Sequence, residues 1–197
     1  MPDVWAHLAD RYEEAYGPKT DSPCWPRARR LAARADGPVL DLACGPGFEL
    51  SLFARAAGID SSPGMLAAAR RRASNASLVL GDVRSLPFRR GVFAGAFSCL
   101  ALIHLTKAEC LSTLRELRTL LRPGAPVSVT FFAGQGERDT GFSPLEASAV
   151  AHYAYYGAAE LEALFLDAGY RDVEVEDAVL NEPVRQLIPC LCVWAVA

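Results

Sequence analysis

The sequence predicts an α/β fold with a doubly wound, mostly parallel sheet, and three observations lead to this expectation. Short apolar runs, typical of strands buried on both faces, alternate with stretches of helical periodicity. The first apolar run leads directly into a Gly-Pro-Gly turn, as strands of such sheets do at a ligand site. Two late strands end the chain and lie close enough in the sequence to form an antiparallel extension.

The predicted elements follow one another in an order typical of right-handed βαβ units. Residues 3–16 predict a leading amphipathic helix, because Trp5, Leu8, Tyr12 and Tyr16 lie near helical spacing before a Gly-Pro stop. Further helices are predicted over 25–34, 48–56, 63–73 and 107–121, and around an apolar face of Leu161, Leu164, Phe165 and Ala168. Strands are predicted over 39–43, 57–60, 77–82, 92–100, 125–132, 170–176 and 190–197.

Capping residues support several of these boundaries. Ser62 is placed as the N-cap of the helix over 63–73, with Pro63 at its first position. The helix over 107–121 has a leucine stripe and ends before Pro123-Gly124, and Gly169 is a plausible C-cap of the late helix. The stretch 133–144 is polar and glycine-rich, and we expect it to connect the parallel strands to that late helix.

Composition and charge exclude several classes of protein. With 197 residues, 51% of them apolar, the chain is long enough for one domain with a real core, and it shows neither a repeat nor a dividing linker. A net charge of −3 gives no basic excess, so nucleic acid is not an expected partner. No charge-free apolar stretch reaches the length of a membrane span and no signal segment is found, so we expect a cytoplasmic protein without membrane contact.

Six cysteines are spread through apolar surroundings without a Cys-X-X-Cys pair. We expect them to be buried small hydrophobic residues of a protein in a reducing compartment. Cys190 and Cys192 are predicted to share one face of a strand, and because no histidine lies nearby no metal site is expected.

The segment DLACGPG, from Asp41 to Gly47, is the first candidate site. An acid near the end of a buried strand, followed by glycines that allow a tight turn and a close approach, is typical of a ligand crevice in a doubly wound sheet. A dinucleotide-binding GxGxxG pattern would need a third glycine where Leu50 stands, and no GK[ST] of a P-loop follows. These absences disfavour NAD, FAD and a P-loop nucleotide.

Two further acids end the next strands. Asp60 can accept hydrogen bonds from both hydroxyls of a ribose, and its alternative role as an N-cap is already filled by Ser61 and Ser62. Asp82 can accept from the exocyclic amine of adenine while the backbone N–H of Val83 serves a ring nitrogen, and its alternative is a turn aspartate.

These segments carry a family resemblance. The runs VLDLACGPG, GIDSSPGMLAAAR, GDVRSLPF, FSCLALIHL, ELRTLLRPGAPVSV and YYGAAELEALFLDAGY occur in this order. Together they resemble the class I S-adenosylmethionine-dependent methyltransferases, and most of all their small methyltransferase type 11-like group. The resemblance implies a Rossmann-like methyltransferase fold with a seven-stranded sheet and an antiparallel last strand. It also implies a single domain over 1–197, with an N-terminal helical cap (1–36), a cofactor-binding core (37–132) and a lid segment with the C-terminal strands (133–197).

The resemblance implies S-adenosyl-L-methionine as cofactor and assigns residues to its parts. The methionine part is expected against the backbone of Ala43, Gly45 and Gly47, with its amino group near Asp41. The ribose is expected on Asp60, with Ser61 and Met65 beside the adenosine, and the adenine on Asp82 and Val83. Ser98, Cys99 and Leu100 are expected to line the floor beneath the sulfonium, and Tyr12 or Tyr16 to close over the donor. Family members usually have a few more residues before the second acid, so either the first crossover helix is short here or the second strand is clipped.

Methyl transfer from a sulfonium needs a base only when the acceptor must lose a proton. His104, on the loop after the strand over 92–100, is the first candidate for that base, and its alternative role is helix capping or packing. His152 is the second candidate. Tyr153, Tyr155 and Tyr156 lie in the segment expected to cover the acceptor, where they either stack on a flat substrate or pack as a lid on the N-terminal helix.

We therefore predict methyl transfer from S-adenosylmethionine to a small or medium organic acceptor, such as a natural-product intermediate, by a monomer or homodimer. One alternative is an enzyme of the same fold that uses the cofactor for another reaction, such as a cyclisation. The others are a binding module with a decayed site and a nicotinamide oxidoreductase.

Overall fold

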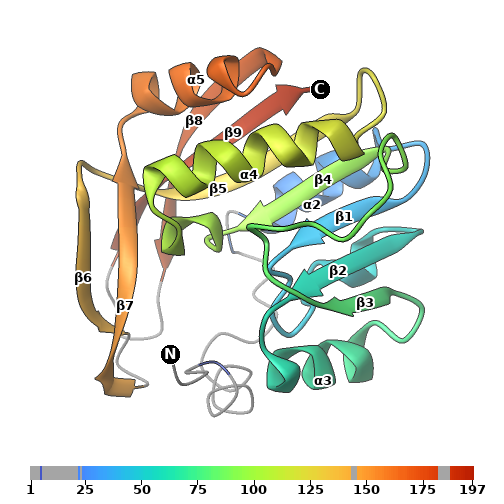
Figure 1. Ribbon diagram of the computed structural model, residues 1–197, viewed down its shortest axis with the longest axis horizontal. Helices are drawn as coiled ribbons and strands as arrows, with labels where there is room; N and C mark the ends of the chain where they lie inside the picture. Colours follow the sequence, from blue (N-terminus) through green and yellow to red (C-terminus); the bar gives the residue numbers. More distant parts are fainter. Residues whose placement is uncertain (1–4, 6–21, 23, 143–145, 182–186) are drawn as a thin grey trace.

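A computed structural model describes residues 5, 22, 24–142, 146–181 and 187–197. Nine strands form one sheet in which β3, β2, β1, β4, β5, β7 and β6 follow one another, and β9 pairs with β5 and β8 (Figure 1). The strands are β1 (Val39–Leu42), β2 (Ala56–Asp60), β3 (Ser77–Leu80), β4 (Gly95–Cys99), β5 (Pro126–Ala133), β6 (Glu137–Phe142), β7 (Glu146–Tyr156), β8 (Arg171–Asn181) and β9 (Leu187–Val196). The predicted doubly wound sheet is therefore present, with nine strands in place of the predicted seven.

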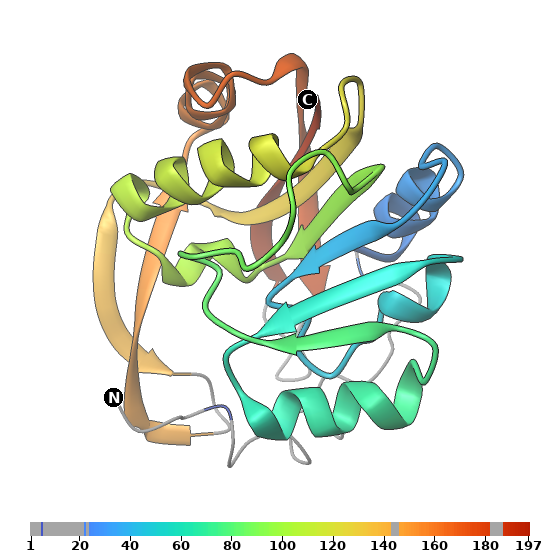
Figure 2. The same ribbon diagram turned by 45° about the vertical axis from the view of Figure 1, so that its right-hand side comes forward.

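The strands from β3 to β5 are parallel to their neighbours, and the chain order reverses between β1 and β4. Most residues of β1, β2, β4 and β5 are buried, which explains the short apolar runs in the sequence, whereas the edge strand β3 is partly exposed. The arrowheads of these strands point toward the same edge of the sheet (Figures 1 and 2). The last strand, β9, is antiparallel to both β5 and β8, which confirms the predicted antiparallel end of the chain.

The two strands beyond the predicted seven form a hairpin of β6 and β7. They pair antiparallel, and β7 joins β5 only through Phe132 and Ala133, beyond the last pair of β5 with β4 at Thr130. Figure 1 shows the hairpin turned away from the direction of the central strands. The polar, glycine-rich sequence of β6 predicted no strand, because its pairing depends on β7 rather than on an apolar face of its own.

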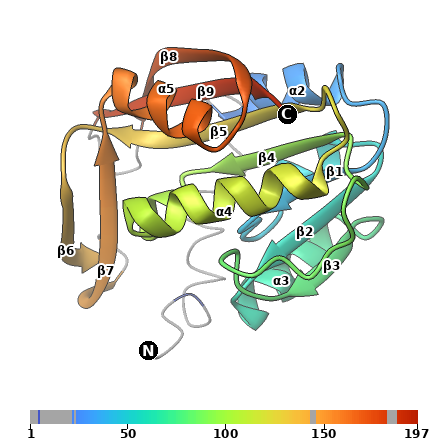
Figure 3. The same cartoon turned by 45° about the horizontal axis from the view of Figure 1, so that its top comes forward.

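Helices cover both faces of the sheet (Figure 3). They are α2 (Cys24–Ala32), α3 (Pro63–Arg72), α4 (Lys107–Leu120) and α5 (Ala158–Asp167). The largest apolar cluster joins α4 and α5 to the sheet, and two smaller clusters lie under α2 and α3. The predicted N-cap is confirmed, since Ser62 Oγ accepts a hydrogen bond from the Met65 N–H at 3.4 Å. The predicted helix over 3–16, with Tyr12 and Tyr16, lies outside the described residues, and no helix in the described part is long and apolar enough to span a membrane.

The crossover between β1 and β2 contains only the 3₁₀ helix η1 (Leu50–Leu52) in place of the predicted helix over 48–56. Asp60 lies only 13 positions after Gly47, and the last five of these positions form the complete strand β2. A 3₁₀ turn needs fewer residues than an α-helix, so the crossover shortens while the strand keeps its length. The acid that ends β2 is thereby kept in register with its neighbours.

Candidate functional site

Asp60 connects the turns that follow β1 and β2. One carboxylate oxygen accepts from the Gly45 N–H at 2.8 Å and the other from the Ser62 N–H at 2.9 Å. Gly45 and Gly47 have φ values of 52° and 74°, a region that glycine adopts at little cost. A Cβ on Gly47 would lie 3.0 Å from the Ala69 Cβ, whereas a Cβ on Gly45 would meet nothing within 4 Å. The glycine turn is thus close to α3 on one side and open at Gly45.

A group of carboxyls lies beside this turn. Burial, with the nearby charges of Glu49 and Asp60, raises the pKa of Asp41 well above its usual range. Burial also raises the pKa of Glu49 to about 7, although Arg72 opposes the shift. Sequence reasoning missed Glu49, which precedes η1 and showed no motif; only its position two residues after Gly47 could have drawn attention to it. A cationic ligand group would relieve the mutual repulsion of these carboxylates.

The predicted nucleoside acids end neighbouring strands. Asp60 is paired with Leu80 of the parallel strand β3, and Asp82 follows two residues later, so both acids come to the same edge of the sheet. Next to them, Ser61 is exposed and Met65 is buried, while Val83 packs against the large apolar cluster. Asp60 and Asp82 therefore lie at the ends of neighbouring parallel strands.

The end of β4 is held from several sides. The fully buried Ser98 hydroxyl donates to the Leu42 carbonyl at 3.0 Å, which ties β4 to β1. Leu100 has a left-handed φ of 53°. Cys99 forms a disulfide with Cys24 at the start of α2. This bond corrects the expectation that all six cysteines are reduced, because the fold brings together two residues that are 75 positions apart. The other four cysteines are buried and form no disulfide: Cys44, Cys110, Cys190 and Cys192.

His104 lies at the end of a short 3₁₀ helix, η2 (Leu102–His104), against β7. Its Nδ1 is 2.9 Å from the His152 carbonyl oxygen, which can only accept, so Nδ1 carries the hydrogen and Nε2 the lone pair. Burial lowers the pKa of His104 below that of an ordinary histidine, so the ring is neutral at pH 7. The ring lies 4.8 Å from that of Tyr153 and 5.4 Å from that of Trp5.

The structure separates the residues predicted along β7. Tyr153 and Tyr155 both stack on Phe132, with ring centroids 6.1 and 6.0 Å apart from it. Because side chains alternate along a strand, His152 and Tyr156 belong to the opposite face. The His152 Nδ1 is 2.9 Å from an Asp139 oxygen. Tyr156 is fully buried in the core.

The comparisons with known proteins agree with this geometry. A methyltransferase domain family matches residues 39–124, which run from β1 past α4. An S-adenosylmethionine-dependent methyltransferase from Methanosarcina mazei superimposes with a TM-score of 0.75 at 18% identity, over 87% of this chain and 96% of that one. Residues 39–124 therefore match a methyltransferase domain family, and the chain has the fold of S-adenosylmethionine-dependent methyltransferases.

Two further proteins that this chain resembles have named acceptors. The 1,6-didemethyltoxoflavin-N1-methyltransferase of Burkholderia thailandensis, solved with 1,6-didemethyltoxoflavin and S-adenosylhomocysteine, has a TM-score of 0.70 at 20% identity, covering 98% of this chain and 86% of that one. A demethylmenaquinone methyltransferase from Beutenbergia cavernae is 33% identical over 115 residues, which are 55% of this chain and 47% of the relative. The chain spans less than half the length of the curated relatives it matches.

Proposed function

We propose that the protein transfers a methyl group from S-adenosyl-L-methionine to a small organic acceptor. The observation that carries this proposal is the group of carboxyls beside the glycine turn, in which Asp41 and Glu49 have raised pKa values next to the open Gly45. Such a group of carboxyls favours a ligand that brings a positive charge close to the glycine turn. When bound, S-adenosylmethionine supplies an electrophilic methyl group on a sulfonium.

Each part of S-adenosylmethionine can be assigned to residues at this edge of the sheet. Asp41 and Glu49 would hold the ammonium group, and the backbone of Ala43 and Gly45 would lie against the methionine part. Asp60 would accept from the ribose. Asp82 and Val83 would hold the adenine from the neighbouring strand end. This division follows from the shared sheet edge, since the carboxyl ends of adjacent parallel strands form one crevice.

On the acceptor side, we assign His104 as the base and the stacked rings of Phe132 and Tyr153 as the apolar wall. A neutral imidazole whose Nδ1–H is held by a carbonyl presents a lone pair at Nε2, which can take a proton from a hydroxyl or amine of the acceptor. The aromatic wall favours a flat organic acceptor. Tyr156 has no part in this wall, because it is buried in the core. The small-molecule ligand of the Burkholderia relative supports an acceptor of this class.

The test is formation of S-adenosylhomocysteine with a panel of flat aromatic acceptors that carry hydroxyl or amine groups. Methylated acceptor and S-adenosylhomocysteine should form in equal amounts. Asp41→Asn should weaken S-adenosylmethionine binding in calorimetry, whereas Asp177→Asn, on the distant strand β8, should not. A cofactor that binds but never yields S-adenosylhomocysteine with any acceptor would contradict methyl transfer, and binding unaffected by Asp41→Asn would contradict the assigned pocket.

A further inference from the structure

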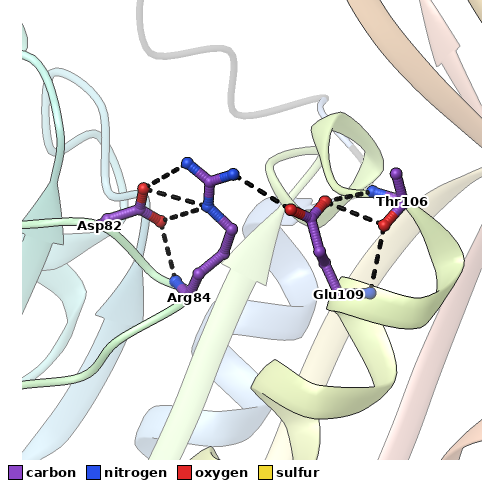
Figure 4. Close-up of polar contacts among 4 residues, drawn as sticks. All are labelled: Asp82, Arg84, Thr106 and Glu109. Atoms are coloured by element: carbon purple, nitrogen blue, oxygen red, sulfur yellow. Dashed lines mark hydrogen bonds and ion pairs between the residues drawn. The ribbon is translucent and has the colours of Figure 1, made fainter.

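The carboxylate of Asp82 is held on both oxygens by a single arginine two residues away (Figure 4). Oδ1 accepts from the backbone N–H of Arg84 at 2.9 Å and from its Nε at 3.0 Å. Oδ2 accepts from Nη2 at 2.6 Å, and Nε lies 3.1 Å from it. The hydrogen bonds from the Arg84 side chain lower the pKa of Asp82, so the carboxyl stays ionised at neutral pH.

Arg84 is itself anchored from the opposite direction. Its Nη1 donates to Glu109 Oε1 at 3.1 Å. Glu109 is fixed in the capping box of α4, where Oε2 accepts from both the N–H and the hydroxyl of Thr106 at 2.9 Å. Figure 4 shows the guanidinium between the two carboxylates, with one residue from the segment after β3 and the other from α4. The orientation of Asp82 therefore depends on two separate elements of the fold.

This network is too exposed to serve mainly as a source of stability. The side chains of Asp82 and Arg84 are 44% and 55% exposed, and that of Glu109 is 38% exposed. Ion pairs of such exposure contribute about 0–1 kcal/mol. Its geometric effect is larger, because an ionised carboxylate has about four acceptor positions and Arg84 brings three hydrogens to them. The backbone N–H is on Oδ1, the Nη2 hydrogen is on Oδ2, and both oxygens share the single Nε hydrogen. One acceptor position of the carboxylate is left for a further donor.

We propose that Arg84 is a positioning residue for cofactor recognition, which orients Asp82 so that the remaining acceptor position of its carboxylate receives the exocyclic amine of adenine. The inference rests on the proposed function, in which Asp82 holds the adenine. It predicts that Arg84 contributes to the preference for adenine over other nucleobases rather than to ligand binding in general. Glu109 supports the same orientation at one step further from the ligand.

The test compares two ligands across a set of variants by calorimetry. S-Adenosylhomocysteine has the amine, and S-inosylhomocysteine has a carbonyl oxygen in its place. The wild type should prefer the adenine ligand, and Arg84→Gln should reduce that preference about tenfold by weakening the adenine ligand alone. Glu109→Gln should reduce it about threefold. Arg90→Gln, an exposed arginine in the same connection between β3 and β4, is the matched control and should leave the preference unchanged.

Two further readouts separate positioning from a general loosening of the site. As the pH is lowered, Arg84→Gln should begin to lose affinity for S-adenosylhomocysteine at a higher pH than the wild type does. The reason is that Asp82 loses the hydrogen bonds that keep it ionised, so its carboxyl is protonated sooner. Arg84→Gln should also raise KM for S-adenosylmethionine with little change in kcat. If Arg84→Gln does not fold, Arg84→Lys keeps the charge without the fork geometry and is expected to lose most of the preference.

The outcomes are distinct. An equal loss of affinity for both ligands would show a general structural role and overturn the inference, as would an unchanged preference in Arg84→Gln. If the wild type binds both ligands equally well, the assignment of Asp82 to adenine is wrong and the inference falls with it. If the wild type binds neither ligand, the proposed function itself fails, and this result is separate from any difference among the variants.

Discussion

Glu49→Gln should change how the stability of the ligand-free protein depends on pH. Burial gives the Glu49 carboxyl a pKa of about 7 in the folded protein, against an ordinary value of 4.5. Because the folded-state pKa is the higher one, folding favours the protonated form. The stability linked to Glu49 is therefore complete below pH 4.5 and is lost as the pH rises through about 7. The difference between these two values corresponds to on the order of 3 kcal/mol in the free energy of unfolding.

Urea denaturation of the two proteins between about pH 5 and pH 8 measures this contribution. Near pH 5, wild type and Glu49→Gln should have similar stabilities, since the wild-type carboxyl is protonated. Near pH 8, the variant should be more stable by up to about 3 kcal/mol, because glutamine carries no charge to bury. Glu162→Gln, at an exposed position of α5, should follow the wild type throughout. Parallel curves for wild type and Glu49→Gln would show that Glu49 is in contact with water, and the argument for a pocket of strained carboxyls would fail.

The same carboxyl links protonation to cofactor binding. The positive charge of S-adenosylmethionine should draw the pKa of Glu49 back down, so binding near pH 7 should release protons from the wild type. Calorimetry in two buffers with different ionisation enthalpies measures the number released. Glu49→Gln should release fewer. An equal release from both proteins would place the proton on another group.

Three further perturbations have defined outcomes. Cys99→Ser removes the disulfide that closes a loop of 75 residues, so it should lower the free energy of unfolding by about 4 kcal/mol. A reducing agent should lower the Tm of the wild type but not that of the variant. His104→Asn should lower kcat about 10²-fold or more while the affinity for S-adenosylmethionine stays the same. The wild-type kcat should fall only at a pH below the ordinary histidine pKa of 6.5, because His104 must be neutral to accept a proton. Gly45→Ala and Gly47→Ala should each lose about 1–2 kcal/mol of stability, because both positions have a left-handed φ. Gly47→Ala should lose more, because its Cβ would also meet Ala69, whereas Gly45→Ala should in addition lose cofactor affinity, because its Cβ enters open space beside the turn. Melting curves and calorimetry would contradict this pair by showing the larger stability loss in Gly45→Ala or the affinity loss in Gly47→Ala alone.

The sequence predicted those parts of the fold that depend on local patterns. The apolar runs located the parallel strands, and Ser62 located the start of α3, because both signals act within a few residues. Partners distant in the sequence left no such signal. The pairing of β6 with β7, the bond between Cys24 and Cys99, and the Arg84 network all depend on tertiary contacts.

The candidate site divides in the same way. Asp60 and Asp82 could be predicted as candidates because they lie at or just after the ends of apolar strands, and the register of β2 with β3 brings those strand ends together. Glu49 was missed because its raised pKa comes from burial beside Asp41. Neither the residue type nor the spacing in the sequence indicates that burial. The three tyrosines of the YAYY region look alike in the sequence, but the alternation of β7 leaves Tyr156 in the core while Tyr153 stacks on Phe132.

The backbone at the switch point of the sheet is strained where the ligand is proposed to lie. Ala43 follows β1 with a φ of 49°, and Leu100 follows the neighbouring parallel strand β4 with a φ of 53°. Each conformation costs about 1–2 kcal/mol in a residue with a side chain. The flanking strands hold both turns in place, since the Cys44 N–H donates to the Ile59 carbonyl and the Leu100 N–H to the Thr130 carbonyl. Strain that the surrounding sheet maintains at two adjacent strand ends is characteristic of a site built in advance for its ligand. The family resemblance assigns the backbone of Ala43 to the methionine part of the cofactor and Leu100 to the floor beneath the sulfonium.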